Sequence, residues 1–287
     1  MNILILGGTR FFGIDTVHEL LRKGHDVTIA TRGLTPDSFG KRVKRVIYDR
    51  TDTESIKRSF CKTYYDVIID KIAYSSNDVK RILDIVLCDK YIQMSSTAVY
   101  DTLHPNIKES EFNPMKKKLV WCERADFDYG EAKRQAECAI AQCYGEKESI
   151  CVRYPVVLGK NDYTKRLDFY VRHIAKSQPM LIDNIDAQLS FINSEDAGKF
   201  IAYLSETNYQ GAVNGASNGT ISVRQIINYV EKKLKKQAVI IENGENAPYN
   251  STCEFSVSTE KAKETGFIFT DINDWIYDLL DYYISKY

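Results

Sequence analysis

The sequence predicts an α/β fold built on a doubly wound parallel β-sheet. Through the first half of the chain, short apolar runs alternate with segments of helical spacing, which is typical of strands joined by crossover helices. The first run, residues 3–6, is apolar at every position. A strand covered by helices on both faces has this pattern, whereas a half-exposed strand alternates.

The elements of the first half follow from this alternation. Residues 12–23 are expected to form a helix, because their apolar positions recur at helical spacing and Gly24 follows them. The further strands are expected at residues 26–31, 44–48, 66–70, 90–95 and 149–154. The further helices are expected at residues 53–60, 77–87 and 128–144.

The alternation becomes irregular after residue 157. Helices are expected near residues 164–176, 194–204, 222–236, 258–265 and 271–286. Short strands are expected near residues 189–192, 238–241 and 255–257, and Val213 marks a last strand of the main sheet. No internal repeat is visible, so a single α/β architecture with a smaller C-terminal part is predicted.

A glycine-rich turn joins the first strand to the first helix. It reads Gly7-Gly8-Thr9-Arg10-Phe11-Phe12-Gly13. The N-terminus of a helix favours anions such as a pyrophosphate, because its N–H groups and dipole point toward them. Gly7 permits the tight turn, and Gly13 lets the helix pack on the strand. A plain tight turn is the alternative, but the strand before and the helix after favour a Rossmann-type dinucleotide site.

The end of the second strand indicates which dinucleotide binds. An acidic residue there would bind the ribose 2′-hydroxyl of NAD, but Asp26 stands at the start of the strand. The C-terminal end carries Arg32, and Arg10 lies in the glycine-rich turn. Two guanidinium groups favour the 2′-phosphate of NADP. NAD is the alternative cofactor, in which case Arg32 is a solvated surface arginine.

These observations divide the chain into two functional parts. We expect residues 1–157 to form an NADP-binding Rossmann domain, to which residues 188–215 return. Residues 158–187 and 216–287 are expected to form a small C-terminal α/β substrate-binding subdomain.

Composition excludes several classes of protein. The 287 residues include 39 basic and 39 acidic side chains, and a neutral balance disfavours a dedicated nucleic-acid-binding protein. Seven cysteines without a C-x-x-C pair and four dispersed histidines indicate neither a disulfide framework nor a metal site. The start of the chain lacks the pattern of a signal peptide, and no run reaches the ~18 apolar residues of a membrane span. A cytoplasmic protein is expected.

A serine, a tyrosine and a lysine are candidates for catalysis. Ser96 follows the strand expected at 90–95, and Tyr129 and Lys133 stand four residues apart on one face of the helix expected at 128–144. A nearby ammonium lowers the pKa of a phenol toward neutrality, so that the phenol transfers protons. A serine hydroxyl at the end of the strand is placed to hold a substrate oxygen. The pattern Tyr-x-x-x-Lys alone is common in helices. The three features in this chain order, first the glycine-rich turn, then the serine and then Tyr-x-x-x-Lys, are a much more specific signal of this chemistry.

Together, these motifs resemble the extended branch of the short-chain dehydrogenase/reductase superfamily, the NAD(P)-dependent sugar epimerase/dehydratase family. The resemblance covers nearly the whole chain. It implies that Ser96 is catalytic, that Tyr129 is the general acid and base, and that Lys133 holds the cofactor ribose and tunes Tyr129. It also implies a set of cofactor contacts: Gly7, Thr9, Arg10, Phe11, Phe12, Gly13, Arg32, Asp49, Arg50, Ala73, Tyr129, Lys133, Tyr154 and Val156.

The resemblance leaves the substrate open. A nucleotide sugar or another hydroxy or carbonyl compound is expected, with Thr97, Tyr100 and Arg166 as candidate contacts. Reduction, epimerisation and dehydration stay as alternatives. The family also suggests a homodimer formed through the helices expected at 77–87 and 128–144.

A non-catalytic function is the alternative to an enzyme. The pattern G-G-T-R-F-x-G resembles a subgroup that includes chloroplast stem-loop RNA-binding proteins, which implies an NADP-binding regulator or an RNA-binding protein as this alternative. Basic clusters at residues 41–45, 116–118 and 232–236 favour it mildly. The plant relatives largely lack the active-site tyrosine, whereas this chain keeps Tyr129, which favours redox chemistry.

Overall fold

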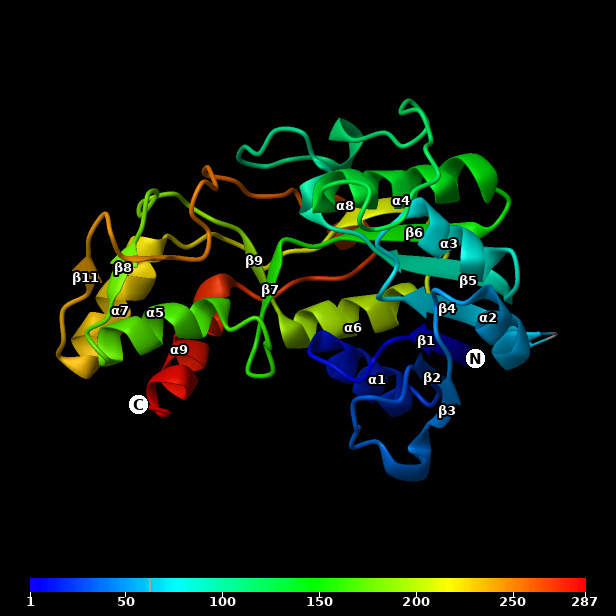
Figure 1. The fold of residues 1–287 in the computed structure, drawn as a ribbon, viewed down its shortest axis with the longest axis horizontal. Helices are drawn as coiled ribbons and strands as arrows, with labels where there is room; N and C mark the ends of the chain where they lie inside the picture. The colour runs from blue at the N-terminus through cyan, green and yellow to red at the C-terminus, as the bar shows by residue number, and fades with distance from the viewer. Residues whose placement is uncertain (62) are drawn as a thin grey trace.

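A seven-stranded parallel sheet forms the centre of the molecule in a computed structural model that describes residues 1–61 and 63–287. Its strand order is β10-β6-β5-β4-β1-β2-β3, so the predicted doubly wound fold is confirmed (Figure 1). The strands are β1 (Asn2–Leu6), β2 (Asp26–Thr31), β3 (Lys44–Ile47), β4 (Tyr64–Asp70), β5 (Leu87–Met94), β6 (Glu148–Arg153) and β10 (Gly211–Asn214). Strand order reverses between β1 and β4, which is where ligands bind in open parallel sheets.

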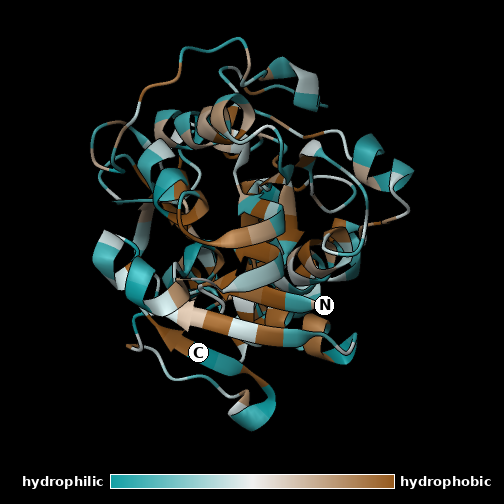
Figure 2. Cartoon of the chain, turned by 90° about the vertical axis from the view of Figure 1, so that its right-hand side faces the viewer, coloured by the Kyte–Doolittle hydropathy of each residue, from teal (hydrophilic) through white to brown (hydrophobic). Residues whose placement is uncertain are grey.

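Both faces of the sheet are covered by helices. Helices α1 (Phe12–Arg22) and α6 (Ser194–Leu204) cover one face, and α2 (Thr53–Phe60), α3 (Ser76–Leu83) and α4 (Tyr129–Cys143) cover the other. In β1, Ile3 and Ile5 belong to the first core, and Leu4 and Leu6 to the second. The apolar run of β1 is continuous because helices bury the strand on both faces. The strands form the most hydrophobic layer in Figure 2.

The C-terminal part has its own apolar core beside the sheet (Figure 1). It packs α5 (Arg166–Ala175), α7 (Val223–Leu234) and α9 (Ile276–Ile284) together, next to a small sheet of β8 (Pro179–Leu181), β11 (Val239–Ile240) and β12 (Glu245–Asn246). A separate pair of strands, β7 (Val156–Leu158) and β9 (Phe191–Asn193), follows β6 and precedes α6. The short helix α8 is Glu260–Glu264.

Several expected boundaries differ from the structure. The helix expected at 77–87 ends at Leu83, and β5 already begins at Leu87. The helix expected from residue 164 begins at Arg166, because Lys165 has a left-handed backbone with φ of 54°. The strand expected at 255–257 is reduced to isolated bridges, and α9 begins only at Ile276 after a 3-10 turn at Ile272–Asp274. Strands β7, β8 and β12 were not expected.

Candidate functional site

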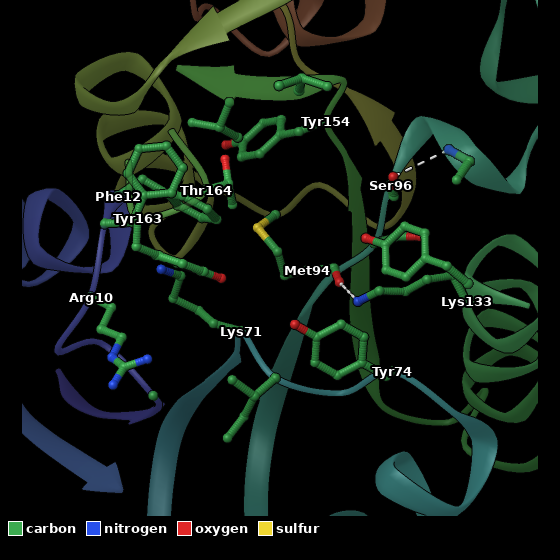
Figure 3. Close-up of a pocket in the computed structure, with 18 of the residues that line it drawn as sticks. Arg10, Phe12, Lys71, Tyr74, Met94, Ser96, Lys133, Tyr154, Tyr163 and Thr164 are labelled. Atoms are coloured by element: carbon green, nitrogen blue, oxygen red, sulfur yellow. Dashed lines mark hydrogen bonds between the residues drawn. The ribbon is translucent and has the colours of Figure 1, made fainter. Parts of the chain in front are cut away.

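A cavity of about 1190 Å³ lies along the C-terminal edge of the main sheet (Figure 3). Its wall is built from the segments that follow β1, β2, β3, β4, β5 and β6, together with residues of the C-terminal part. The predicted catalytic residues and all predicted cofactor residues except Gly13 and Ala73 therefore line one cavity. This is the crevice in which open parallel sheets bind their ligands.

The glycine-rich turn has the backbone of an anion-binding loop. Gly7 and Gly8 have φ of 100° and 99°, which side chains with a Cβ atom rarely adopt. Phe11, at the start of α1, is also strained, with φ of 52°. Gly13 does not line the cavity: a Cβ atom there would lie 2.9 Å from the Gly8 Cα atom, so this glycine allows α1 to pack against the turn.

The segments after β2 and β3 form the end of the cavity that contains Arg32 and Asp49. The Arg10 guanidinium donates a hydrogen bond to Thr35 Oγ1 at 3.1 Å. The Asp49 carboxylate accepts hydrogen bonds from the backbone and hydroxyl of Thr51, which keep its pKa low. Arg50 also lines the cavity, but its guanidinium donates two hydrogen bonds to the buried Asp70 carboxylate, at 2.9 and 3.0 Å.

A half-buried lysine that the motifs do not include lies at the reversal point of the sheet. Lys71 follows β4, lines the cavity, and places its Nζ atom 3.6 Å from the centroid of the Phe12 ring. Its nearness to α1 is also shown by Gly13, where a Cβ atom would come within 2.5 Å of Lys71 Nζ. Burial lowers the pKa of Lys71 to about 7.

The start of α4 places Tyr129 beside Ser96. Asp128 caps the helix by accepting a hydrogen bond from the Glu131 backbone N–H at 2.8 Å. Gly130 lets the helix approach the turn after β5 closely, because a Cβ atom there would lie 2.6 Å from the Ala98 carbonyl oxygen. The Ser96 hydroxyl accepts a hydrogen bond from the Ala98 backbone N–H at 3.2 Å.

Lys133 is held one helical turn from Tyr129. Its ammonium donates a hydrogen bond to the carbonyl oxygen of Met94 at 2.6 Å (Figure 3) and another to that of Ala73 at 2.7 Å. The side chain is buried, and burial lowers its pKa to about 8. Ala73 thus reaches the site through its backbone carbonyl rather than by lining the cavity.

The environment of the Tyr129 phenol contains opposing influences. Burial in the cavity raises its pKa, while the Ser96 hydroxyl and the cations Arg124 and Arg166 act in the opposite direction. The ring is still 48% exposed, so a molecule in the cavity can reach it. The net effect raises the pKa of Tyr129. The protonated phenol, next to a serine hydroxyl, is suited to proton exchange with a bound oxygen.

The other predicted contacts divide into two groups. Thr97, Tyr154, Val156 and Arg166 line the cavity. Tyr100 does not fit its prediction as a substrate contact: its ring is 4% exposed, and its hydroxyl donates to Asn214 Oδ1 and contacts Arg153 inside the protein. The extended backbone at Tyr100, after the 3-10 turn at Thr97–Val99, directs this side chain into the core.

The sequence motifs missed several residues of the cavity. Lys71 and Tyr74 follow β4, and their position at the C-terminal end of a parallel strand was a usable signal. Arg124, Tyr163 and Tyr249 belong to irregular segments, where no periodicity marks them. They reach the cavity only through the tertiary fold.

Metal-binding clusters and membrane-spanning helices are both absent from the described residues. Among these residues, no group of three or more histidine, cysteine, aspartate or glutamate side chains is arranged to hold a metal ion. None of the helices in the described ranges is long and apolar enough to span a membrane.

Two curated relatives match part of this chain. A 41-kDa chloroplast stem-loop binding protein of Arabidopsis thaliana is 24% identical over 66% of this chain and 50% of its own length. The 2'-dehydrokanamycin reductase of Streptomyces kanamyceticus is 24% identical over 71% of this chain and 58% of its own length. The match thus spans 50% of one relative and 58% of the other.

Solved epimerase structures share the fold over the whole chain. The UDP-glucose 4-epimerase of Thermotoga maritima, solved with UDP-glucose, superposes with a TM-score of 0.76 at 15% identity, covering 100% of this chain and 99% of its own. The UDP-glucose 4-epimerase of Thermus thermophilus, solved with NAD, gives a TM-score of 0.70 at 17% identity and 99% coverage of both chains.

The model of the NAD dependent epimerase/dehydratase family matches residues 3–218, which span the glycine-rich turn, Ser96, Tyr129 and Lys133. This match extends from β1 through β10 and therefore includes every strand of the main sheet. With the doubly wound fold and the shared cavity, it establishes that the chain is a member of the NAD-dependent epimerase/dehydratase family.

Proposed function

We propose that this protein is an NADP-dependent oxidoreductase or epimerase of the extended short-chain type. Its substrate is a nucleotide sugar or another hydroxy or carbonyl compound. The observation that carries the proposal is the convergence of Ser96, Tyr129 and Lys133 at a cavity that continues to the glycine-rich turn. The reductase among the curated relatives supports redox chemistry.

The residues of the cavity fit a dinucleotide. The positive φ angles of Gly7 and Gly8 shape the turn for close approach of a pyrophosphate, and the N-terminus of α1 stabilises its charge. Lys133 and the segment after β4 are placed to hold the ribose next to the reacting carbon. When bound, the nicotinamide supplies or accepts a hydride.

Tyr129 performs the proton transfer in this proposal. In reduction, its hydroxyl donates a proton to the substrate oxygen; in oxidation, its phenolate takes the proton from the substrate hydroxyl. The Ser96 hydroxyl donates a hydrogen bond to the same oxygen and orients the substrate. The buried Lys133 ammonium stabilises the phenolate electrostatically, because its charge is poorly screened there.

Preference for NADP rests on the charge at the Arg32 end of the cavity. In the described part of the chain, no carboxylate lies within 4 Å of the guanidinium of Arg10 or Arg32, and both residues line the cavity. A 2′-phosphate is a suitable partner for them. NAD is the competing cofactor, since the family is named for it and a similar structure was solved with it.

One experiment tests the cofactor, with Arg32→Ala compared with Arg42→Ala. Arg42 is an exposed arginine outside the cavity and serves as the matched control. Arg32→Ala is expected to weaken NADPH binding about 10- to 100-fold and to leave NADH binding unchanged. Equal affinities of the wild type for NADPH and NADH would refute NADP preference.

A second experiment tests the chemistry. The wild type and Tyr129→Phe are compared for NADPH oxidation with a panel of carbonyl compounds and for conversion of nucleotide sugars. Loss of the phenolic hydroxyl is expected to lower the rate about 100- to 10,000-fold while cofactor binding persists. Full activity of Tyr129→Phe would exclude Tyr129 as the acid and base.

RNA binding is the second candidate function, favoured by the similarity to the chloroplast stem-loop binding protein. The basic clusters give it little support, since Arg45, Lys117 and Lys233 pair with carboxylates. A wild-type protein that converts no substrate but shifts labelled RNA at physiological salt would favour this candidate over the enzyme.

A further inference from the structure

Unpaired arginines gather at the cavity. Most arginines of the chain pair with a carboxylate within 4.0 Å: Arg22, Arg45, Arg50, Arg58, Arg81, Arg134, Arg153, Arg172 and Arg224. Within the described residues, no such pair is formed by Arg10, Arg32, Arg42, Arg124 and Arg166. Of these, all but Arg42 line the cavity. These arginines outnumber the carboxylates of the wall, Asp49, Asp78 and Glu123, so positive charge predominates in the cavity.

Two of these arginines belong to the catalytic end of the cavity. Arg124 lies in the segment before α4, and its guanidinium carbon is 3.9 Å from the centroid of the Tyr74 ring. The Tyr74 ring in turn packs edge-on against the Tyr129 ring, with centroids 6.1 Å apart. Arg166 is the first residue of α5, where the helix dipole adds to its positive charge. Both cations act electrostatically on the Tyr129 phenol.

The cavity wall contributed by the C-terminal part beyond α5 is electrically neutral. The described residues that it places on the wall are Leu189, Ser190, Phe191, Tyr249, Asn250, Thr252 and Phe255. None of them carries a positive charge. A nucleotide diphosphate bound along this wall would lose its hydration without gaining a cation, which is costly for a charged group. The positive charges of Arg124 and Arg166 lie instead at the Tyr129 end of the cavity.

We propose that the substrate is a compact hydroxy or carbonyl compound that carries a phosphate or carboxylate, and that Arg124 and Arg166 bind this anion beside Tyr129. This rests on the proposed function and chooses between its two substrate classes. Arg124 and Arg166 are both exposed to solvent, so an anion with a fixed geometry can pair with their guanidinium groups. Binding there orients the substrate oxygen toward Tyr129.

The test measures equilibrium binding to protein saturated with NADP, so that the cofactor's own phosphate sites are filled. The probes are inorganic phosphate, glucose, glucose 6-phosphate and UDP-glucose. Inorganic phosphate and glucose 6-phosphate are expected to compete for one site, with glucose 6-phosphate binding more tightly than glucose or UDP-glucose. Arg124→Met and Arg166→Met are each expected to weaken glucose 6-phosphate binding at least about tenfold. Arg42→Met, the control outside the cavity, is expected to leave it unchanged.

Several results would overturn the inference. The first is tighter binding of UDP-glucose than of glucose 6-phosphate. The second is an equal loss of glucose 6-phosphate binding in Arg42→Met, and the third is that neither inorganic phosphate nor glucose 6-phosphate binds. Tyr129→Phe separates this inference from the proposed function, because it should lose turnover and keep anion binding. If the wild type binds the anion through both arginines but never transfers hydride, only the proposed function fails. If it turns over neutral substrates at rates that the arginine variants do not change, only this inference fails.

Discussion

The Lys133 ammonium lies 5.9 Å from the centroid of the Tyr129 ring, one turn away on the same face of α4. Hydrogen bonds to the Ala73 and Met94 carbonyl oxygens hold it there. Burial raises the pKa of Tyr129, while the Ser96 hydroxyl and the cations Arg124 and Arg166 oppose that effect. A charged Lys133 ammonium favours the phenolate in the same direction. The four-residue spacing of Tyr129 and Lys133 therefore places a positive charge near the phenol, where it influences the pH range in which the phenol transfers protons.

Replacing Lys133 by Met is expected to shift the pH dependence of activity. In the oxidation direction Tyr129 must be deprotonated, so activity rises with pH through its pKa. Without the ammonium the phenolate is less stable, and the rise should move upward by about one pH unit. The measurement is kcat/KM against pH for wild type and variant. Lys57→Met, a change of an exposed lysine, should leave the profile in place.

Replacing Lys71 by Met is expected to stabilise the ligand-free protein. Burial lowers the pKa of Lys71 from 10.5 to about 7, so between these values the unfolded chain binds more protons than the folded one. Stability of the wild type therefore rises with pH from about 7 to 10.5, and the full penalty remains below pH 7. The variant removes a penalty on the order of 1–4 kcal/mol at pH 7.

Urea unfolding at pH 7, 8 and 9 measures this difference, with Lys57→Met as the control. The wild-type free energy of unfolding should rise over that range, and the rise should be smaller in Lys71→Met. The variant should also bind NADPH more weakly, because Lys71 faces the cavity beside the glycine-rich turn. A variant less stable than the wild type at pH 7 would contradict the prediction.

Replacing Glu137 by Gln is expected to destabilise the fold strongly. Glu137 accepts two hydrogen bonds from the Arg153 guanidinium, at 2.6 and 3.0 Å, and neither side chain is exposed. Removal of one partner leaves the other charge buried and unpaired, which costs about 3–5 kcal/mol. Chemical denaturation measures the loss. Glu19→Gln, which breaks the exposed pair with Arg22, should change stability little, and similar losses in both variants would contradict this account.

Replacing Gly130 by Ala is expected to reduce activity although alanine is the better helix former by about 1 kcal/mol. The new Cβ atom would come within 2.6 Å of the Ala98 carbonyl oxygen, so α4 must move away from the turn that carries Ser96. A displacement of about 1 Å between reacting groups can cost about 100-fold in rate. Steady-state kinetics measures the loss, and wild-type activity in Gly130→Ala would show that the close approach is unnecessary.

Local patterns in the sequence were sufficient for the doubly wound sheet and for much of the site. Apolar runs, helical spacing and the glycine-rich turn are properties of neighbouring residues, and so is the four-residue spacing of Tyr129 and Lys133. Parallel strands end at one edge of a sheet, so the sequence by itself predicts that Ser96 and the glycine-rich turn lie at the same edge. The folded chain brings them to one cavity.

The tertiary structure alone decided the rest. Arg166 was a candidate contact from the sequence, but its position near Tyr129 together with Arg124 follows only from packing. Tyr100, four residues after Ser96, turns into the core toward Asn214, because the 3-10 turn between them redirects the chain. Strands β7 and β9 pair although more than 30 residues separate them. Such contacts depend on long-range packing, which no local periodicity encodes, so the gathering of Arg124 and Arg166 near Tyr129 became visible only in the folded chain.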